Sequence, residues 1–383
     1  AVALKYADQP EGIEPALTEA AAIYERLARD NGALGEVYNE LGTLRRRQER
    51  FQEADELYAR ALEIYASVYG DDSERYATVL NNRAINMLSL GRLNEGEAAM
   101  RRSLEISSAI YGESTPGRVM SKRANHGSML AGMCKYAEAE AVIARAIDEH
   151  ERVLPPDHPS KAFPLIYMAE VLLELRRNEE ALEHARRASS LLLAAYGPDS
   201  PYVVRAQDVE SRALERTGKP DEAIEAIKAA IHATITGFGA DSVYIAPLQF
   251  DHALIVTRAG DPAEGLAMWE RACSMIDATG FDAGALDSTI ASERIMAHAA
   301  ILSALGDAER ALAELDRWWR VMGTPERFKF KIRNDEAASL RIKLLRAANR
   351  NDEADACARF LLAAAEQSLG PDHPRTLEIA SGM

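Results

Sequence analysis

The chain has 383 residues, of which 47% are hydrophobic and 6% aromatic, and its formal net charge is −15. This acidity argues against general nucleic-acid binding, which depends on Lys and Arg at phosphates. No run approaches the roughly 18 apolar residues that cross a bilayer. The three cysteines, at 134, 273 and 357, have neither a disulfide framework nor a metal spacing. We therefore expect a cytoplasmic protein in a reducing compartment, with no membrane partner.

The N-terminal region, residues 1–34, is predicted to form one or two capping helices around residues 16–27. Terminal repeats of a stacked array need such helices, because one face would otherwise be left without a neighbour. The chain begins without Met and within a pattern of apolar residues that is already helical. We therefore expect it to be a portion of a longer polypeptide.

Residues 35–280 contain a regular motif in which Glu is followed by Ala or Gly. The second residue of each pair recurs in steps of 42, 43, 42, 42 and 42, at Ala54, Gly96, Ala139, Ala181, Ala223 and Gly265. A fixed period of this size means that each unit buries its apolar face by stacking on its neighbours. Because apolar residues within each unit keep helical spacing, the pattern predicts an array of helical repeats.

The second copy shows the repeating unit most clearly. Its apolar residues predict one helix over 78–88 and another over 94–110. Gly91 lies between them, where a left-handed helix end is needed, and Gly adopts that conformation without a Cβ clash. Asn94 is predicted to cap the second helix. Turns rich in Gly and Pro then separate successive units, as in Tyr196-Gly-Pro-Asp-Ser-Pro201.

Residues 281–383 follow the motif less closely. Ala311 comes 46 residues after Gly265, and the stretch 317–346 holds nine basic and three acidic residues. Its aromatic residues include Trp318, Trp319, Phe328 and Phe330. We interpret them as packing between divergent helices, with the charged heads of Lys329, Lys331 and Arg333 in water. A surface that stacks bases or grips an acidic partner is the alternative.

Together these features resemble the tetratricopeptide repeat, in the longer form of about 42 residues found in kinesin light chains and many bacterial multidomain proteins. The resemblance is carried by Leu-Asn-Asn-x-Ala at 80–84, Ala-Leu at 61–62, the Gly-x-hydrophobic-x-Glu-Ala turn and Gly-Pro-Asp-His-Pro at 370–374. It covers residues 36–275 well and 285–375 more loosely. It implies an all-α, right-handed superhelical solenoid of about eight helix-turn-helix repeats.

Catalytic motifs are absent from the sequence. His150-Glu151 lacks a second His at the metalloprotease spacing, and Gly237-Phe-Gly239 lacks the third Gly and the preceding strand of a dinucleotide loop. Asp157-His158 and Asp372-His373 are interpreted as turns whose side chains bond local backbone. We therefore predict that the chain is not an enzyme and has no catalytic residue and no cofactor.

Three histidines, His126, His252 and His298, occupy the same repeat position, each before a Gly or an Ala. Adjacent repeats stand about 10 Å apart, the helix-packing distance. Because these copies are not all neighbours, one zinc ion could not join them. The sequence predicts buried or partly buried structural histidines and no metal site.

The resemblance implies that the first helix of each repeat lines a concave surface that binds extended or helical peptides. The exposed inner positions are predicted to be Asn39, Thr43, Asn81 and Lys122 in the early repeats, and Arg205, Asp208 and Arg212 in the fifth. Asn82, the second Asn of the Leu-Asn-Asn segment, is a further candidate. Amides both donate and accept hydrogen bonds, so they can hold a peptide backbone without selecting its sequence. For Asn82, a bond to a neighbouring helix is the alternative.

The sequence therefore predicts a protein–protein interaction scaffold that binds a peptide or protein partner. The resemblance extends this to a regulatory or sensory arm of a larger bacterial signalling protein, for example one attached to a serine/threonine kinase. A catalytic domain of the same polypeptide would then be among its partners. The alternatives are a free-standing adaptor, a substrate-positioning module of an enzyme whose catalytic domain lies elsewhere, and a nucleic-acid-binding array that uses residues 317–346.

Overall fold

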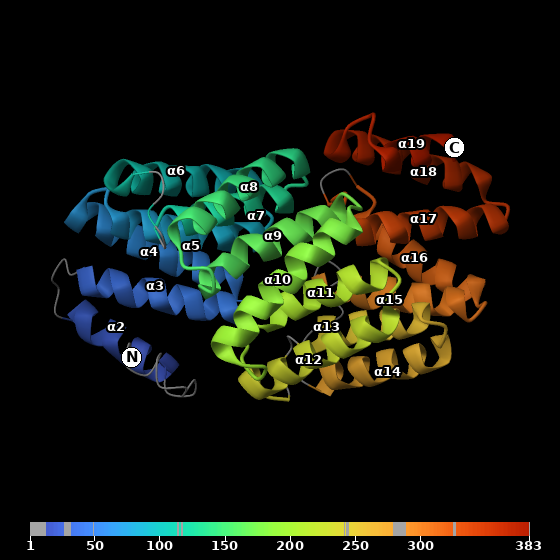
Figure 1. Cartoon of the computed structure of the whole chain (residues 1–383), viewed down its shortest axis with the longest axis horizontal. Coiled ribbons are helices and arrows are strands. Elements are labelled where there is room, and N and C mark those ends of the chain that lie inside the picture. Colours follow the sequence, from blue (N-terminus) through green and yellow to red (C-terminus); the bar gives the residue numbers. More distant parts are fainter. Residues whose placement is uncertain are drawn as a thin grey trace. The chain divides into compact units, whose positions relative to one another are not determined.

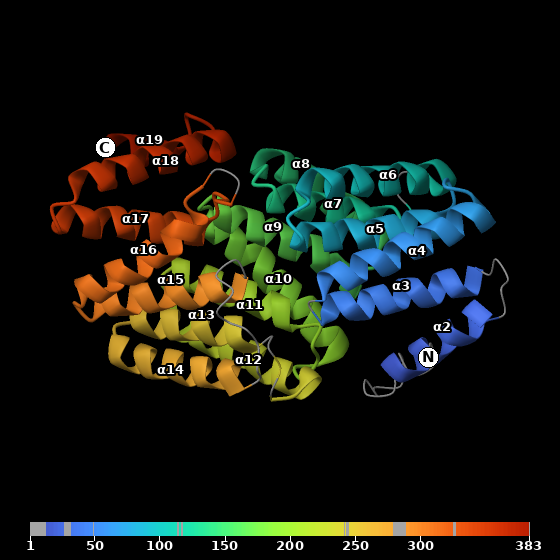
Figure 2. The ribbon, with the colours of Figure 1, turned by 180° about the vertical axis from the view of Figure 1, so that it is seen from behind.

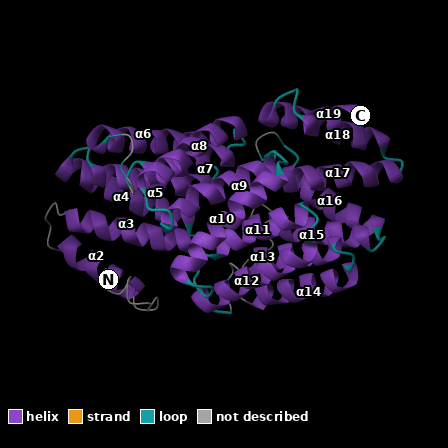
Figure 3. Cartoon of the chain, viewed as in Figure 1, coloured by secondary structure: helices purple, strands orange, loops and turns teal. Residues whose placement is uncertain are grey.

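In a computed structural model of the chain, the described residues are 13–26, 32–48, 50–112, 115, 118–240, 242, 245–278, 289–324 and 327–382. Within these ranges every regular element is a helix and no strand is present (Figure 3). The chain divides into two compact units: unit 1 comprises residues 1–133 and 138–154, and unit 2 comprises residues 134–137 and 155–383. The predicted all-α repeat solenoid is confirmed.

Unit 1 is built from consecutive helices that pack in pairs, α3 on α4 and α5 on α6 (Figure 1). Its helices are α2 (Ile13–Arg26), α3 (Gly32–Arg47), α4 (Phe51–Tyr69), α5 (Glu74–Ser89), α6 (Leu93–Tyr111), α7 (Met120–Gly132) and α8 (Tyr136–Val153), the last of which begins in unit 2. The first helices of successive repeats also touch, since α5 contacts both α3 and α7.

Unit 2 continues the same pairing, and α17 packs against both α16 and α18 (Figure 2). Besides the first residues of α8, it runs from the 3-10 helix η2 (Pro159–Lys161) to α19 (Pro374–Ser381). Between them lie α9 (Ala162–Glu174), α10 (Asn178–Tyr196), α11 (Val204–Arg216), α12 (Pro220–Phe238), α13 (Ile245–Arg258), α14 (Pro262–Ala278), α15 (Thr289–Ala304), α16 (Ala308–Met322), α17 (Ile332–Ala347) and α18 (Asn351–Leu369).

The predicted domain boundaries stay predictions. The predicted boundary between residues 34 and 35 falls in the first turn of α3, two residues after the helix begins. Assigned helix ends vary by one or two residues, so this difference does not decide where the capping region ends. The boundary between 280 and 281 lies outside the described residues. The stretch 35–280 and the stretch 281–383 both consist of helix pairs wherever they are described.

The turn between the two helices of a repeat is closed by a backbone hydrogen bond that recurs in seven repeats among the described residues. In the second copy the N–H of Arg92 donates to the carbonyl of Met87, five residues earlier, at 2.9 Å, and Gly91 has φ +73° as predicted. This is the bond that marks a Schellman helix end. The cap prediction was wrong by two residues, because α6 begins at Leu93 with Arg92 before it. The Arg92 guanidinium contacts Glu95 there, at 3.0 Å.

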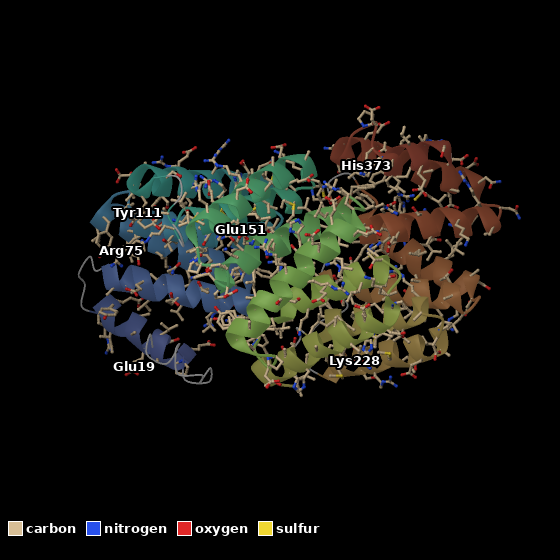
Figure 4. All side chains as sticks on the ribbon, viewed as in Figure 1. Glu19, Arg75, Tyr111, Glu151, Lys228 and His373 are labelled. Atoms are coloured by element: carbon tan, nitrogen blue, oxygen red, sulfur yellow. The ribbon has the colours of Figure 1, made fainter. Side chains whose placement is uncertain are left out.

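In the two Asp-His turns, the histidine side chains bond local backbone, as predicted. His158 accepts a hydrogen bond from the backbone N–H of Ser160 at 3.2 Å, before η2. His373 accepts one from the N–H of Arg375 at 3.1 Å, before α19 (Figure 4). Each imidazole therefore caps a helix start that begins with Pro, a role in local structure.

Close packing of α3 on α4 depends on glycines that face tyrosine rings. A Cβ on Gly42 would lie 2.8 Å from the nearest ring carbon of Tyr58, and a Cβ on Gly35 would lie 2.6 Å from Tyr65. Tyr58 has no exposed surface, so its ring has nowhere to move. These glycines are therefore needed for the short distance between the two helices.

Replacing Gly42 by Ala is expected to destabilise unit 1 by about 1 kcal/mol. The gain in helix propensity is about 1 kcal/mol, but overpacking a rigid site costs about 1–3 kcal/mol. Ser67→Ala at an exposed position of α4 gains helix propensity alone and serves as the control. Thermal melts followed by circular dichroism decide the sign, and a rise in both variants would contradict the packing argument.

The aromatic residues of the stretch 317–346 lie inside the protein. Trp318 is 1% exposed, and Phe328 and Phe330 are also buried. The rings of Trp318 and Phe328 meet edge to face with centroids 6.3 Å apart. The packing interpretation is therefore confirmed for these rings, which are not available to stack bases. The interpretation was wrong for Arg333, whose guanidinium bonds Asp251 instead of lying free in water.

Candidate functional site

In unit 1, asparagine side chains join the first helices of three repeats. The Nδ2 of Asn82 on α5 donates to Oδ1 of Asn39 on α3 at 3.0 Å. Asn81 donates to Oδ1 of Asn82 at 3.2 Å, and Asn125 on α7 donates to Oδ1 of Asn81 at 3.1 Å. We call these four residues the amide row. The helix-to-helix bond expected as the alternative role of Asn82 is present.

Asn125 was missed by the sequence interpretation although a signal existed. Residues 39, 82 and 125 are spaced by 43, so Asn125 occupies the repeat position of Asn39 and Asn82. Asn39 and Asn82 are partly exposed, whereas Asn81 is buried at 9% exposure. The prediction that Asn81 is exposed was therefore wrong, because its amide turns between Asn82 and Asn125.

The two other predicted residues of unit 1 are engaged within the fold. Thr43 donates to the carbonyl of Asn39 at 3.0 Å and accepts from the hydroxyl of Tyr58 at 3.2 Å. Lys122 is only 5% exposed, and its Nζ donates to Glu74 at 2.9 Å and to Ser107 at 2.5 Å. The prediction that Lys122 is exposed was wrong, since an ammonium that leaves water needs such partners. Burial lowers the pKa of Lys122.

In unit 2 the three predicted residues lie on α11 and face neighbouring first helices. Arg205 forms two hydrogen bonds with the Glu170 carboxylate of α9, at 2.8 and 2.7 Å. Its guanidinium also lies 4.8 Å from the ring centre of Tyr167. Arg212 and Asp208 form a longer ion pair at 3.9 Å. The structure therefore brings these side chains together in one charged layer.

Arg333, at the start of α17, extends this layer across two further first helices. It bonds the Asp251 carboxylate of α13 and lies 3.3 Å from Oε1 of Glu293 on α15. Within the described part of the chain, Oδ1 of Asp208 and Oε2 of Glu293 are buried without a hydrogen-bond partner. We call Asp208, Arg212, Asp251, Glu293 and Arg333 the charged cluster. It holds three carboxylates against two guanidinium groups.

The first turn of α17 makes further contacts with the ends of earlier first helices. The backbone N–H of Ile332 donates to Glu174, the last residue of α9, at 2.6 Å. Glu336 pairs with Arg216 of α11 and Arg258 of α13, both at 2.9 Å. Glu174, Arg216 and Arg258 share one repeat position, at steps of 42. Sequence reasoning did not find these contacts, because no pattern indicated that residues 332 and 336, several repeats later, would reach that position.

A small cavity of about 150 Å³ lies beside the charged cluster, between α13, α15, α16 and α17. Its apolar wall includes Leu254, Met296, Leu315 and Leu340. Glu293, Arg333 and Glu336 line its polar side. The cavity could take a single small side chain next to a charged group, but its volume is far below that of a usual small-molecule site.

Asp208 should make unit 2 less stable at neutral pH than at mildly acidic pH. Burial raises the pKa of its carboxyl from the ordinary 3.8 to about 6, and nearby Asp251 adds to the effect while Arg212 opposes it. A proton is therefore held more tightly in the folded chain than in the unfolded chain. The stabilisation from this proton is present below pH 3.8 and is lost as pH rises through about 6.

Replacing Asp208 by Asn is accordingly expected to raise the melting temperature of unit 2 at pH 8. The free-energy gain should be about 1–3 kcal/mol and should shrink toward pH 5, where the wild-type carboxyl takes up its proton. Asp148→Asn, at an exposed position of α8, is the matched control. An equal gain at pH 5 and pH 8 would show that ionisation of Asp208 is not the cause.

The three histidines at one repeat position are partly buried, as predicted. His126 contacts Glu97 at 3.3 Å. His298 stacks on Trp269, with ring centroids 3.9 Å apart, and contacts Glu314 at 3.1 Å. Burial lowers the pKa of His252. His126 and His298 therefore have local structural roles.

Reactive groups of other kinds are not assembled in the described residues. No cluster of three or more His, Cys, Asp or Glu side chains there is placed to hold a metal ion. The three cysteines are buried, and burial raises the pKa of the Cys273 and Cys357 thiols to about 11. None of the described helices combines the length and the apolar character needed to cross a membrane.

Comparison with known sequences identifies one family. A model described as the tetratricopeptide repeat matches residues 33–109, 118–194 and 164–233, about half of the chain. No curated protein sequence matches at a significant level.

Several solved structures are similar in fold. A Rap protein complexed with Competence and Sporulation Factor has a TM-score of 0.56 at 13% identity, over 91% of this chain and 98% of that one. NprR in complex with its cognate peptide NprX has a TM-score of 0.55 at 12% identity, over 79% and 82%. Kinesin light chain TPR-like repeats from Podosopora anserina reach 0.46 at 14% identity, over 53% and 95%. At these identities the first two show the fold alone.

Proposed function

Because this chain belongs to the tetratricopeptide repeat family, we propose that it is a protein-interaction scaffold whose first helices bind a peptide segment of a partner protein. Repeats of this kind stack into an extended surface on which several consecutive units contact one ligand. We propose one such surface in each unit: Asn39, Thr43, Asn81, Asn82 and Lys122 in unit 1, and Arg205, Asp208 and Arg212 in unit 2. Thr43 and the buried Asn81 and Lys122 would act by positioning their neighbours.

The observation that carries this proposal is the amide row of unit 1. Each amide offers two N–H donors and a carbonyl oxygen with two lone pairs, and Asn82 uses one donor and one lone pair within the row. Asn39 and Asn82 are partly exposed, so this remaining capacity faces outward from α3 and α5. A peptide backbone has the complementary alternation of N–H and C=O groups, spaced along an extended strand.

Two of the similar structures support a peptide as the ligand. The Rap protein is complexed with Competence and Sporulation Factor, and NprR is in complex with its cognate peptide NprX. Both share the fold over most of their length. The carboxylates and amides of the first helices here are compatible with a ligand of that class.

At a finer level, the proposed role is a regulatory or sensory arm of a larger bacterial signalling protein, such as one with a serine/threonine kinase domain. A free-standing adaptor and a substrate-positioning module of a separate enzyme remain alternatives within the same fold. The flanking coding sequence distinguishes these cases. Nucleic-acid binding through residues 317–346 loses its basis in stacking, because Trp318, Phe328 and Phe330 are buried.

The test is site-specific photocrosslinking in cells that express the full chain. A photoreactive residue in place of Asn82 is expected to capture a defined partner segment, and a second one in place of Arg205 maps the surface in unit 2. The control position is Glu56, which is exposed on the second helix α4. Equal capture at residues 56 and 82, or capture at neither, would show that the first helices are not the binding surface.

A further inference from the structure

The stretch from Arg327 to Glu336 does not follow the rule that each repeat contacts only its neighbours. We call residues 327–336 the insert. The N–H of Ile332 reaches Glu174, 158 positions earlier, and Asp335 reaches Arg176, 159 positions earlier. In addition, the carbonyl of Phe330 accepts from the buried Tyr136 hydroxyl at 2.6 Å. The insert therefore lies across the ends of α9, α11 and α13, several repeats away from its own.

The insert contacts these helices as a peptide ligand would. Its backbone supplies one donor, at Ile332, and one acceptor, at Phe330. Its side chains supply a cation, Arg333, for the carboxylates of Asp251 and Glu293. Mixed backbone and side-chain recognition of this type is how helical-repeat surfaces and peptide clefts hold a short segment.

The acidic end of the insert pairs with a separate basic set. Asp335 is 1% exposed and accepts from Arg176 and from Arg375, and Glu336 bridges Arg216 and Arg258. The surface beneath the insert thus has a fixed charge order, acidic opposite residue 333 and basic opposite residues 335 and 336. It fits a segment that carries Arg followed two and three positions later by acidic residues.

The insert leaves part of this surface unsatisfied. Oδ1 of Asp208 and Oε2 of Glu293 are buried and unpaired within the described part of the chain, and a buried acceptor without a hydrogen bond destabilises the folded state. Three carboxylates of the charged cluster face two guanidinium groups. A ligand with a second cationic side chain would complete the pairing that the insert leaves incomplete.

We propose that the insert is an internal occupant of the partner-binding surface of unit 2. The partner is a peptide segment with an Arg, a second basic residue near it, and acidic residues two and three positions after the Arg. This rests on the proposed scaffold function and adds its partner class and its regulation. Binding of the partner requires the insert to leave, so the apparent affinity is reduced by the fraction of chains in which the insert is docked.

The direct test uses a fluorescein-labelled synthetic peptide of residues 327–338 and the full chain. The Arg333→Gln chain is expected to bind this peptide at least about tenfold more tightly than wild type, because its own insert is weakened while the peptide still brings an Arg. Arg327→Gln, which removes the same charge from an exposed position of the insert, is the matched control. The same peptide with Gln at the position of Arg333 should lose most of its binding to the Arg333→Gln chain. The Asp251→Asn chain should likewise bind the unmodified peptide weakly.

Equal affinity for the Arg333→Gln and Arg327→Gln chains, or no binding by either, overturns the proposal. Circular dichroism confirms that each variant is folded before the comparison. A second readout needs no variant: excess peptide should speed amide exchange at Ile332 in the wild-type chain and leave α18 unchanged. Unchanged exchange at Ile332 overturns the proposal as well. Crosslinking at residue 82 is independent of unit 2, so a partner captured there would leave the scaffold function standing.

Discussion

Replacing Asp335 by Ala is expected to destabilise unit 2 by about 3–5 kcal/mol, as removal of one partner from a buried ion pair usually does. Arg375 forms two hydrogen bonds with this carboxylate, at 2.8 and 2.5 Å, and Arg176 forms a third at 2.7 Å. The Arg375 side chain is 10% exposed, so its guanidinium would lose its buried counter-ion and keep the exposed Glu378, at 2.8 Å, as its ion-pair partner. Arg176 is 37% exposed and can return to water, which places most of the cost on Arg375.

Thermal melts of the full chain measure this effect, since a domain of this size loses roughly 2–4 °C for each kcal/mol. Asp372→Ala, at an exposed position before α19, removes the same group without a buried partner and should change the midpoint little. Asp335→Asn should recover part of the loss, because an amide oxygen still accepts from Arg375. If Asp335→Ala melts within about 1 °C of Asp372→Ala, the ion pairs are not structural.

The second large effect is expected in unit 1, where Glu74→Ala should cost about 2–4 kcal/mol. Glu74 accepts from the Nζ of Lys122 at 2.9 Å, and the Lys122 side chain is 7% exposed. Without the carboxylate, the ammonium is left with Ser107 as its remaining close partner. This loss is smaller than the largest losses seen when a buried ion pair is broken. Burial already lowers the pKa of Lys122, so in the variant the Lys122 ammonium can lose its proton instead of remaining charged without a carboxylate.

This explanation has a pH signature. A base whose pKa is lowered on folding penalises the folded state fully below its folded pKa, and the penalty is relieved as pH rises from that value to the ordinary 10.5 of the unfolded chain. The Glu74→Ala chain should therefore gain stability between neutral and alkaline pH by more than wild type does. Amide exchange in α5 and α7 reports the change locally. The Glu74→Ala, Lys122→Met double variant should recover most of the loss; no recovery would mean that the buried charge is not its source.

The repeats were predictable because the signal for them is local and recurs. Each unit carries its own Glu-Ala helix start and its own turn residue, and Gly91 adopts the left-handed conformation that its position required. The error of two residues at Asn94 has the same local origin, since Asn94 and Arg92 are both polar and only the observed hydrogen bonds show where α6 begins. Periodicity thus predicts elements better than their ends.

The site was predictable only where it followed the period. Asn39 and Asn82 were identified, and the same spacing of 43 would have added Asn125. By contrast, Arg333 and its partner Asp251 are 82 residues apart, which is not a multiple of the repeat. Asp251 itself follows the period, 43 residues after Asp208 and 42 before Glu293, but its partner Arg333 does not. The irregular stretch after residue 265 signalled a departure from the array, but no pattern indicated which helices it would contact.

The contact between α17 and α9 changes how unit 2 can come apart. In a linear array with nearest-neighbour coupling, terminal repeats fray independently of the middle. The bonds of Ile332 and Asp335 to Glu174 and Arg176 link the fourth and eighth repeats directly, so the intervening helices are enclosed by a closed circuit of contacts. Closing the loop between two residues 158 positions apart costs only about 1 kcal/mol more in chain entropy than closing the loop between adjacent repeats. Helices α9 to α17 should consequently open as one cooperative block, and release of the insert would turn that block back into separable repeats.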